Sequence, residues 1–183
     1  MKKSLLGNLI LVFLSTAITL LIAEYGLRLL APNLASEPVT SNQYNFYRYD
    51  PLLGWSNIPD ARGTFSRTEF SYELNINSLG LRGAGITTEK PAGTRRIAVL
   101  GDSFVWGIGA AEPELFTTLL ADSLPATQVL NFGVAGYSPI QHHLLTDKVL
   151  ALDPDLVIIS FCLGNDFADA VYWNRYDYYK PYA

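Results

Sequence analysis

The sequence has almost none of the residues that build disulfides and transition-metal sites. A single cysteine, Cys162, occurs in 183 residues, so no intrachain disulfide can form. Cys162 lies in an apolar run, which favours a packing role. The only two histidines, His142 and His143, are adjacent and would point in different directions on a helix. We therefore expect no metal site and no other cofactor.

Charge is also sparse, and basic residues are the scarcer kind. Only 16% of the residues are charged. After residue 30, sixteen acidic residues stand against ten basic ones, a net charge of −6. An acidic balance disfavours nucleic acids and anionic membrane surfaces as partners. A neutral or sugar-like substrate is more compatible with it.

The glycine-rich stretch VLGDSFVWGIG (99–109) lacks the features of a phosphate-binding loop. Gly101, Gly107 and Gly109 could approach a phosphate closely, but no Gly-x-Gly-x-x-Gly occurs and no Lys-Ser or Lys-Thr follows the glycines. The spacing therefore disfavours a nucleotide site and leaves Ser103 to be explained.

The N-terminus contains a long uncharged run, Leu5–Ala23. Nineteen residues form a helix about 28 Å long, close to the thickness of a bilayer core. The nearest small-residue cleavage site, at 33–35, is poor, so we predict an uncleaved anchor over residues 1–31. Lys2 and Lys3 place the N-terminus in the cytoplasm and the rest of the chain outside, which is the periplasm in a Gram-negative bacterium.

Composition divides the remainder into three parts. Residues 32–45 have the prolines and small polar residues of a linker. Residues 46–90 read as a small β-rich region: YELNIN (72–77) alternates like a half-buried strand, and the preceding GTFSRTEF could be its hairpin partner. Its aromatic residues at 44–50 fit either core packing or sugar stacking. Residues 91–183 form the main domain.

The main domain alternates three apolar runs with two helical segments. The runs are 95–103, 127–138 and 155–166, and the helical spacing covers 113–124 and 139–152. This order predicts an α/β fold in which a parallel sheet carries helices on both faces. Each apolar run ends in a polar loop with glycine. Because parallel strands end at the same edge, these loops should lie together, where ligands bind in such sheets.

The three loops contain the parts of an acyl-transfer site. Ser103, at a strand-to-helix turn, would expose its hydroxyl as a nucleophile and its backbone N–H as an oxyanion donor. The backbone N–H of Gly136 and the carboxamide of Asn165 could supply two further donors.

These blocks resemble the SGNH family of GDSL-type esterases and lipases. Gly101-Asp102-Ser103, Gly136 in NFGVAGYS, and Asn165-Asp166 match its first three blocks over residues 95–170. The resemblance implies a flavodoxin-like fold, a nucleophilic role for Ser103, and an oxyanion hole made by Ser103, Gly136 and Asn165. Asp102 and Asp166 would support the loops.

Two departures from the family pattern stand out. Leu163 replaces a glycine that often lies two residues before the asparagine. More seriously, the Asp-x-x-His that provides the catalytic base is missing: Pro139 and Ile140 stand three residues before the two histidines. We therefore interpret the chain as the N-terminal part of such a fold, weakly active or inactive as given.

These observations predict a membrane-anchored ester hydrolase, whose substrate would be an acyl ester such as the O-acyl groups of exported or cell-surface polysaccharide. Without its base, the same cleft could instead bind a glycan or a partner protein without catalysis. The aromatic segment VYWNRYDYYKPY (171–182) fits sugar stacking as well as packing.

Overall fold

The computed structural model describes residues 2–30, 43–173 and 179–182. The chain forms two compact units, Met1–Thr40 and Ser41–Ala183. The first contains helix α1 (Lys2–Leu30), whose segment Leu6–Leu27 has a mean hydropathy of 2.3. The length and composition of this segment allow it to cross a bilayer, but a signal sequence can have the same length and composition.

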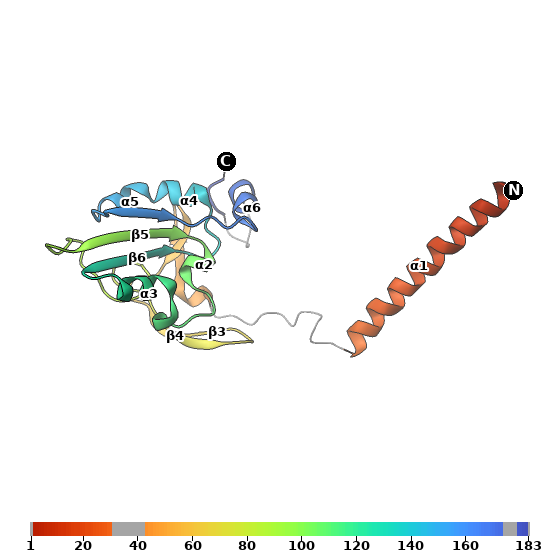
Figure 1. Ribbon diagram of the computed structural model, residues 1–183, viewed down its shortest axis with the longest axis horizontal. Coiled ribbons are helices and arrows are strands. Elements are labelled where there is room, and N and C mark those ends of the chain that lie inside the picture. The colour runs from red at the N-terminus through yellow and green to blue at the C-terminus, as the bar shows by residue number, and fades with distance from the viewer. Residues whose placement is uncertain (1, 31–42, 174–178, 183) are drawn as a thin grey trace. The chain divides into compact units, whose positions relative to one another are not determined.

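The second unit is built around a parallel sheet with strand order β6-β5-β7 (Figure 1). Its strands are β5 (Arg95–Gly101), β6 (Thr127–Gly133) and β7 (Leu156–Ile159). Gly101 pairs with Gly133, and Leu100 pairs with Ile159. The predicted parallel strands are therefore confirmed, and the loops that follow them leave from one edge of the sheet.

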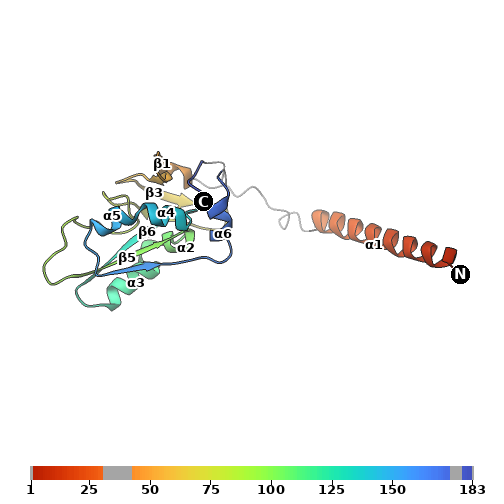
Figure 2. The same ribbon diagram turned by 90° about the horizontal axis from the view of Figure 1, so that it is seen from above.

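Helices cover the two faces of the sheet, as Figure 2 shows. Helix α3 (Phe116–Ser123) lies on one side, and α4 (Pro139–Leu144) and α5 (Thr146–Leu150) lie on the other. Alternate residues of β5 enter different cores: Ile97 and Val99 pack with Val105, whereas Ala98 and Leu100 pack with residues of α5 and β6. The predicted helix at 139–152 is divided in two at Leu145.

The β-rich region consists of two antiparallel hairpins. One pairs β1 (Tyr47–Asp50) with β2 (Gly54–Asn57), and the other pairs β3 (Arg62–Ser66) with β4 (Ser71–Asn75). The predicted strand and its hairpin partner are thus confirmed. A short 3₁₀ turn, Gln43–Phe46, precedes β1, and another, Glu112–Glu114, precedes α3.

Two tryptophans join the hairpins to the sheet. Trp55 of β2 belongs to the same core as Ala98 and Leu100, and Trp106 belongs to the hairpin core with Phe65 and Leu74. Residues 46–90 and the main domain therefore share their hydrophobic cores and form parts of one compact unit.

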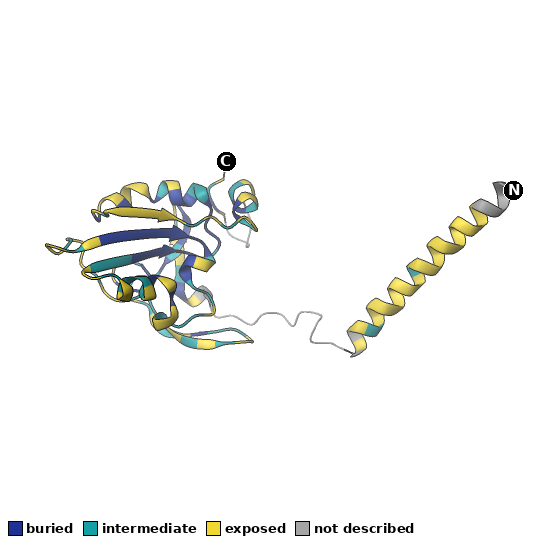
Figure 3. Cartoon of the chain, in the orientation of Figure 1, coloured by how far each residue is buried: buried dark blue, intermediate teal, exposed yellow. Residues whose placement is uncertain are grey.

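Strand β7 differs from the other two strands because its side chains are exposed. In Figure 3, β7 is drawn as exposed beside the buried β5. Leu156 and Ile159 retain 45% and 59% of their accessible surface. An apolar cavity of about 360 Å³ lies between β7 and helices α4 and α5. Among the described residues, only β5 pairs with β7.

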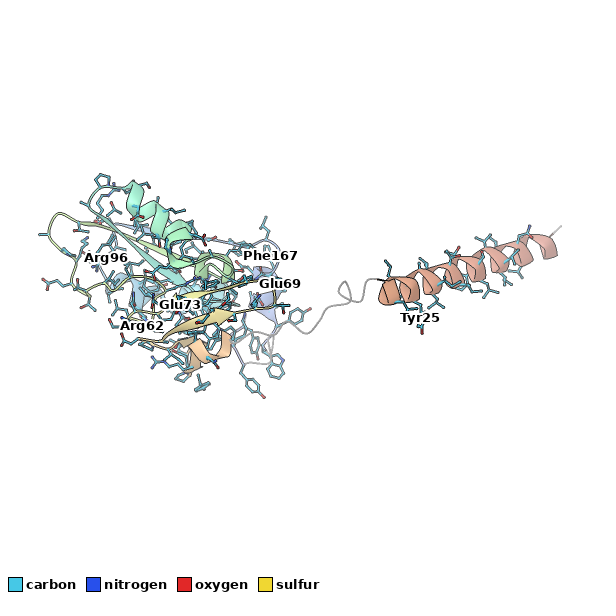
Figure 4. The ribbon with its side chains drawn as sticks, turned by 90° about the horizontal axis from the view of Figure 1, so that it is seen from below. Tyr25, Arg62, Glu69, Glu73, Arg96 and Phe167 are labelled. Atoms are coloured by element: carbon cyan, nitrogen blue, oxygen red, sulfur yellow. The ribbon has the colours of Figure 1, made fainter. Side chains whose placement is uncertain are left out.

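Arg96 lies at the start of β5, at the end of the sheet away from the three polar loops. Its side chain links the strands to the loop before β5. This side chain is fully buried and labelled in Figure 4. Its guanidinium donates to the carbonyls of Thr88, at 2.9 Å, and Leu152, at 2.6 Å, and to Gln128 Oε1, at 2.8 Å. The planar guanidinium has five N–H bonds in fixed directions, so it can donate to several acceptors at once.

Candidate active site

The nucleophile candidate Ser103 begins helix α2 (Ser103–Trp106), directly after β5. Asp102 caps this helix: its Oδ1 accepts a hydrogen bond from Phe104 N at 2.9 Å. Ser103 is partly exposed. Within the described residues, neither its Oγ nor its backbone N–H makes a hydrogen bond to a neighbour. Both groups are thus available to a ligand.

The turn after Ser103 is held by Arg82, which is buried and belongs to the segment that follows β4. Its guanidinium donates to the carbonyls of Trp106 and Gly107, both at 2.6 Å, and to Ala110 O at 2.5 Å. The guanidinium carbon also lies 4.6 Å from the centre of the Trp106 ring. Cations are favourable at a helix C-terminus, where the carbonyls lack helical partners. The β-rich region therefore supports the turn that carries Ser103.

Gly136 lies in the loop after β6, with φ at +79°. This left-handed conformation favours glycine. Trp55 Nε1 donates to the neighbouring Ala135 carbonyl at 3.1 Å, and the Tyr137 hydroxyl donates to the Trp55 carbonyl. No described residue accepts a hydrogen bond from Gly136 N–H. The loop is fixed by β2 while this predicted oxyanion donor stays unengaged.

Asn165 immediately precedes helix α6 (Asp166–Val171) and joins the third loop to the first. Its Nδ2 donates to Asp102 Oδ2 at 3.1 Å and to Asp169 Oδ2 at 2.7 Å. A carboxamide has only two N–H bonds, and both are directed at carboxylates here. The structure therefore brings Asn165 to Asp102, and one of these bonds must open before Asn165 can hold an oxyanion. That role stays a prediction.

Three carboxylates are buried around Asn165. Asp102, Asp166 and Asp169 are at most 3% exposed. Asp166 Oδ2 accepts from Cys162 N at 2.8 Å, across the turn that leads into α6. Burial raises the pKa of Asp166, and the nearby charges of Asp102 and Asp169 raise it further. A cation close to these groups would stabilise their ionised forms.

Such a cation is present in Lys180, which the sequence analysis did not single out. Its Nζ donates to the Gly136 carbonyl at 2.8 Å and lies 3.7 Å from Asp169 Oδ1. The only signal in the sequence was a lysine within an aromatic-rich segment. Within the described residues, no group of three or more His, Cys, Asp or Glu side chains could hold a metal ion.

His142 lies in α4 close to Gly101 and Asp102. The side chain is 3% exposed, and neither ring nitrogen makes a hydrogen bond to a described residue. Burial lowers the pKa of the imidazole, although the polar groups of Gly101 and Asp102 oppose the shift. His142 is therefore a packed residue that lies near the end of β5.

The lowered pKa of His142 predicts that stability falls in acid. The folded protein keeps this imidazole neutral, whereas the unfolded chain binds a proton as pH falls below about 6.5. The free energy of unfolding should therefore decrease from about pH 6.5 downward until the lowered folded pKa is passed. From this group the slope is at most about 1.4 kcal/mol per pH unit.

Denaturant titrations at several pH values measure this dependence. His142→Leu should flatten the decrease between pH 6.5 and the lowered pKa. His143→Leu is the matched control, because the adjacent His143 side chain is exposed, and it should keep the wild-type slope. Identical slopes in all three proteins would contradict the assignment to His142.

Neither a protein-family model nor a curated protein sequence matches this chain.

Proposed function

We propose that this chain belongs to the SGNH type of ester hydrolase, with Ser103 as its nucleophile and α1 as its membrane anchor. The supporting observation is the meeting of three sequence blocks at one edge of the parallel sheet. The hydrogen bond of 3.1 Å between Asn165 and Asp102 links the third block directly to the first. Ser103 N–H and Gly136 N–H both lack partners among the described residues.

In the proposed reaction, Ser103 Oγ attacks the carbonyl carbon of an ester. Oγ loses its proton as the new O–C bond forms. The C–O bond to the alcohol then breaks, and the alcohol leaves with a proton that replaces the one lost from Oγ, while the acyl group stays on Oγ. Ser103 N–H and Gly136 N–H would stabilise the oxyanion, with Asn165 joining when one of its carboxylate partners releases it. Water or a second alcohol would take the acyl group in the next step, giving hydrolysis or transfer.

Proton removal from Ser103 is the weak step for these 183 residues, because they contain no Asp-x-x-His. A serine without a positioned base is a poor nucleophile, and loss of one member of such a triad costs several orders of magnitude in rate. We therefore expect slow or undetectable turnover, so binding of a boronic acid to Ser103 is a better test than hydrolysis.

The proposed substrate is an O-acyl group on an exported or cell-surface polysaccharide. The net charge of −6 after residue 30 favours a neutral or sugar-like partner over an anionic one. Lys2 and Lys3 before the apolar helix favour an outward-facing domain. A non-catalytic glycan-binding role is the alternative, favoured by the stacked rings of Trp173 and Tyr179, whose centres are 5.2 Å apart.

Phenylboronic acid tests the proposed site directly. We expect the detergent-solubilised protein to form a tetrahedral adduct, in which a B–O bond to Ser103 Oγ replaces the O–H bond and the proton goes to buffer. Boron-11 NMR follows the change from trigonal to tetrahedral boron. Ser103→Ala should abolish this adduct, because the oxygen that binds boron is removed.

Ser78→Ala is the matched control for this experiment, since Ser78 is an exposed serine in a turn, and this variant should keep the adduct. An adduct that survives Ser103→Ala would rule out Ser103 as the nucleophile. Absence of any adduct, combined with retention of the protein on an acetylated glycan, would favour the binding role.

A further inference from the structure

Lys180 contacts both the Gly136 loop and helix α6 through its side-chain nitrogen. Its side chain is completely buried. Nζ donates to the Gly136 carbonyl at 2.8 Å and lies 3.7 Å from Asp169 Oδ1. It also lies 5.8 Å from the centre of the Trp55 ring. A buried ammonium is costly unless such acceptors and counter-charges surround it.

Asp169 extends this contact to Asn165. One carboxylate oxygen of Asp169 faces Lys180, and the other accepts the Asn165 amide at 2.7 Å. A continuous series of polar contacts therefore runs from Gly136 through Lys180 and Asp169 to Asn165. Its two ends are the predicted oxyanion donors that come from different strand-end loops.

The segment that carries Lys180 is closely packed. A Cβ added to Gly54 would lie 2.3 Å from the Tyr179 carbonyl oxygen and 3.2 Å from Lys180 Cα. The backbone N–H of Lys180 donates to the Trp173 carbonyl at 3.0 Å. Gly54 of β2 and Trp173 therefore constrain the backbone at Lys180, and the Gly136 carbonyl and the Asp169 carboxylate hold its Nζ.

We propose that Lys180 is a positioning residue that sets the separation between Gly136 and Asn165. This inference rests on the proposed function and deepens it. By holding the Gly136 carbonyl and the Asp169 carboxylate, Lys180 orients both loops for a tetrahedral, negatively charged species. It needs no contact with the reacting atoms.

The test compares the affinity for phenylboronic acid in three variants. Lys180→Met should weaken the Ser103 adduct about 10- to 100-fold, since displacement of a site by about 1 Å costs that much. The same substitution leaves Asp169 as a buried carboxylate that has lost this cation, so it should also destabilise the fold. Lys90→Met is the matched control: Lys90 pairs with Asp153 and Asp155 just before β7, at the opposite end of the sheet. It should keep the wild-type affinity.

The double variant Lys180→Met/Asp169→Asn distinguishes a positioning role of Lys180 from a role in stability alone. Removing both charges should restore much of the stability, measured by thermal unfolding, while the adduct stays about 10-fold or more weaker. Recovery of both stability and affinity would show a merely structural role and overturn the inference, as would wild-type affinity in Lys180→Met. An adduct missing from the unsubstituted protein would overturn the proposed function itself, and this inference with it.

Discussion

Gly133→Ala should lower the free energy of unfolding by about 3 kcal/mol, the upper end of the usual cost of overpacking. A Cβ on Gly133 would lie 2.2 Å from Trp106 N, 2.6 Å from Val105 C and 2.8 Å from Trp106 Cα. All three atoms belong to the backbone of α2. Because no side-chain rotation can relieve such contacts, α2 would have to move away from β6.

Chemical denaturation of the detergent-solubilised chain measures this loss, and Gly85→Ala is its control. A Cβ at Gly85 would meet no atom within 4 Å, so this variant should change stability by less than about 0.5 kcal/mol. Equal unfolding midpoints for the two variants would show that β6 and α2 are not held in close contact.

The close approach at Gly133 also positions Ser103. Asn131 of β6 donates through Nδ2 to the Val105 carbonyl at 2.7 Å and accepts Gly133 N at 2.9 Å. On the neighbouring strand, a Cβ at Gly101 would lie 2.2 Å from a methyl group of Val105. The two paired glycines thus let α2 rest directly on the strand ends. The movement of α2 that we expect in Gly133→Ala should therefore also weaken the binding of phenylboronic acid to Ser103.

Local sequence patterns were sufficient to predict the three parallel strands, the helical segments between them and the β3–β4 hairpin, but not β1, β2 or α6. The apolar runs that end at Gly101 and Gly133 are β5 and β6, and the alternation of Tyr72 and Leu74 belongs to β4. Side-chain periodicity depends on neighbours two to four residues away, so it is readable from the chain. The shared edge of the three loops follows from parallel strand direction alone.

Contacts between distant segments could not be read in the same way. Arg82 lies between β4 and β5, yet it binds carbonyls 24 to 28 residues further along the chain. Lys180 reaches Gly136 across 44 residues. Nothing in the spacing of these residues indicates such partners, because the burial of a cation depends on which distant segments pack around it in the folded chain.

Strand β7 has an apolar sequence, but its side chains are exposed. Its residues Leu156–Ile159 are entirely apolar, which is typical of a parallel strand buried on both faces. The described residues leave both faces exposed and pair only its inner edge. Phe161, Leu163 and Phe167 continue this apolar surface toward Asn165. The apolar sequence therefore predicts that β7 is more deeply buried than the described residues make it.

Arg82→Met should destabilise the protein by about 3 kcal/mol or more. The substitution keeps an apolar stem but removes the guanidinium N–H groups that donate to the carbonyls of Trp106, Gly107 and Ala110. The Gly107 carbonyl keeps the Ala110 N–H as a donor, at 3.1 Å, so the carbonyls of Trp106 and Ala110 lose most. Each buried carbonyl left without a donor costs about 1–3 kcal/mol, whereas removal of a buried charge returns part of this energy. Contact of the cation with the ring of Trp106 is also lost.

Two other substitutions identify the cause of this loss. Arg82→Lys keeps the charge but cannot direct a planar fork at several carbonyls, so it should recover only part of the stability. Arg62→Met removes an exposed guanidinium from β3, labelled in Figure 4, and should cost less than about 0.5 kcal/mol. If Arg82→Lys matched the wild type, charge alone would stabilise the turn. If Arg82→Met cost no more than Arg62→Met, the β-rich region would not support the turn that carries Ser103, and its contribution to the site would lie elsewhere.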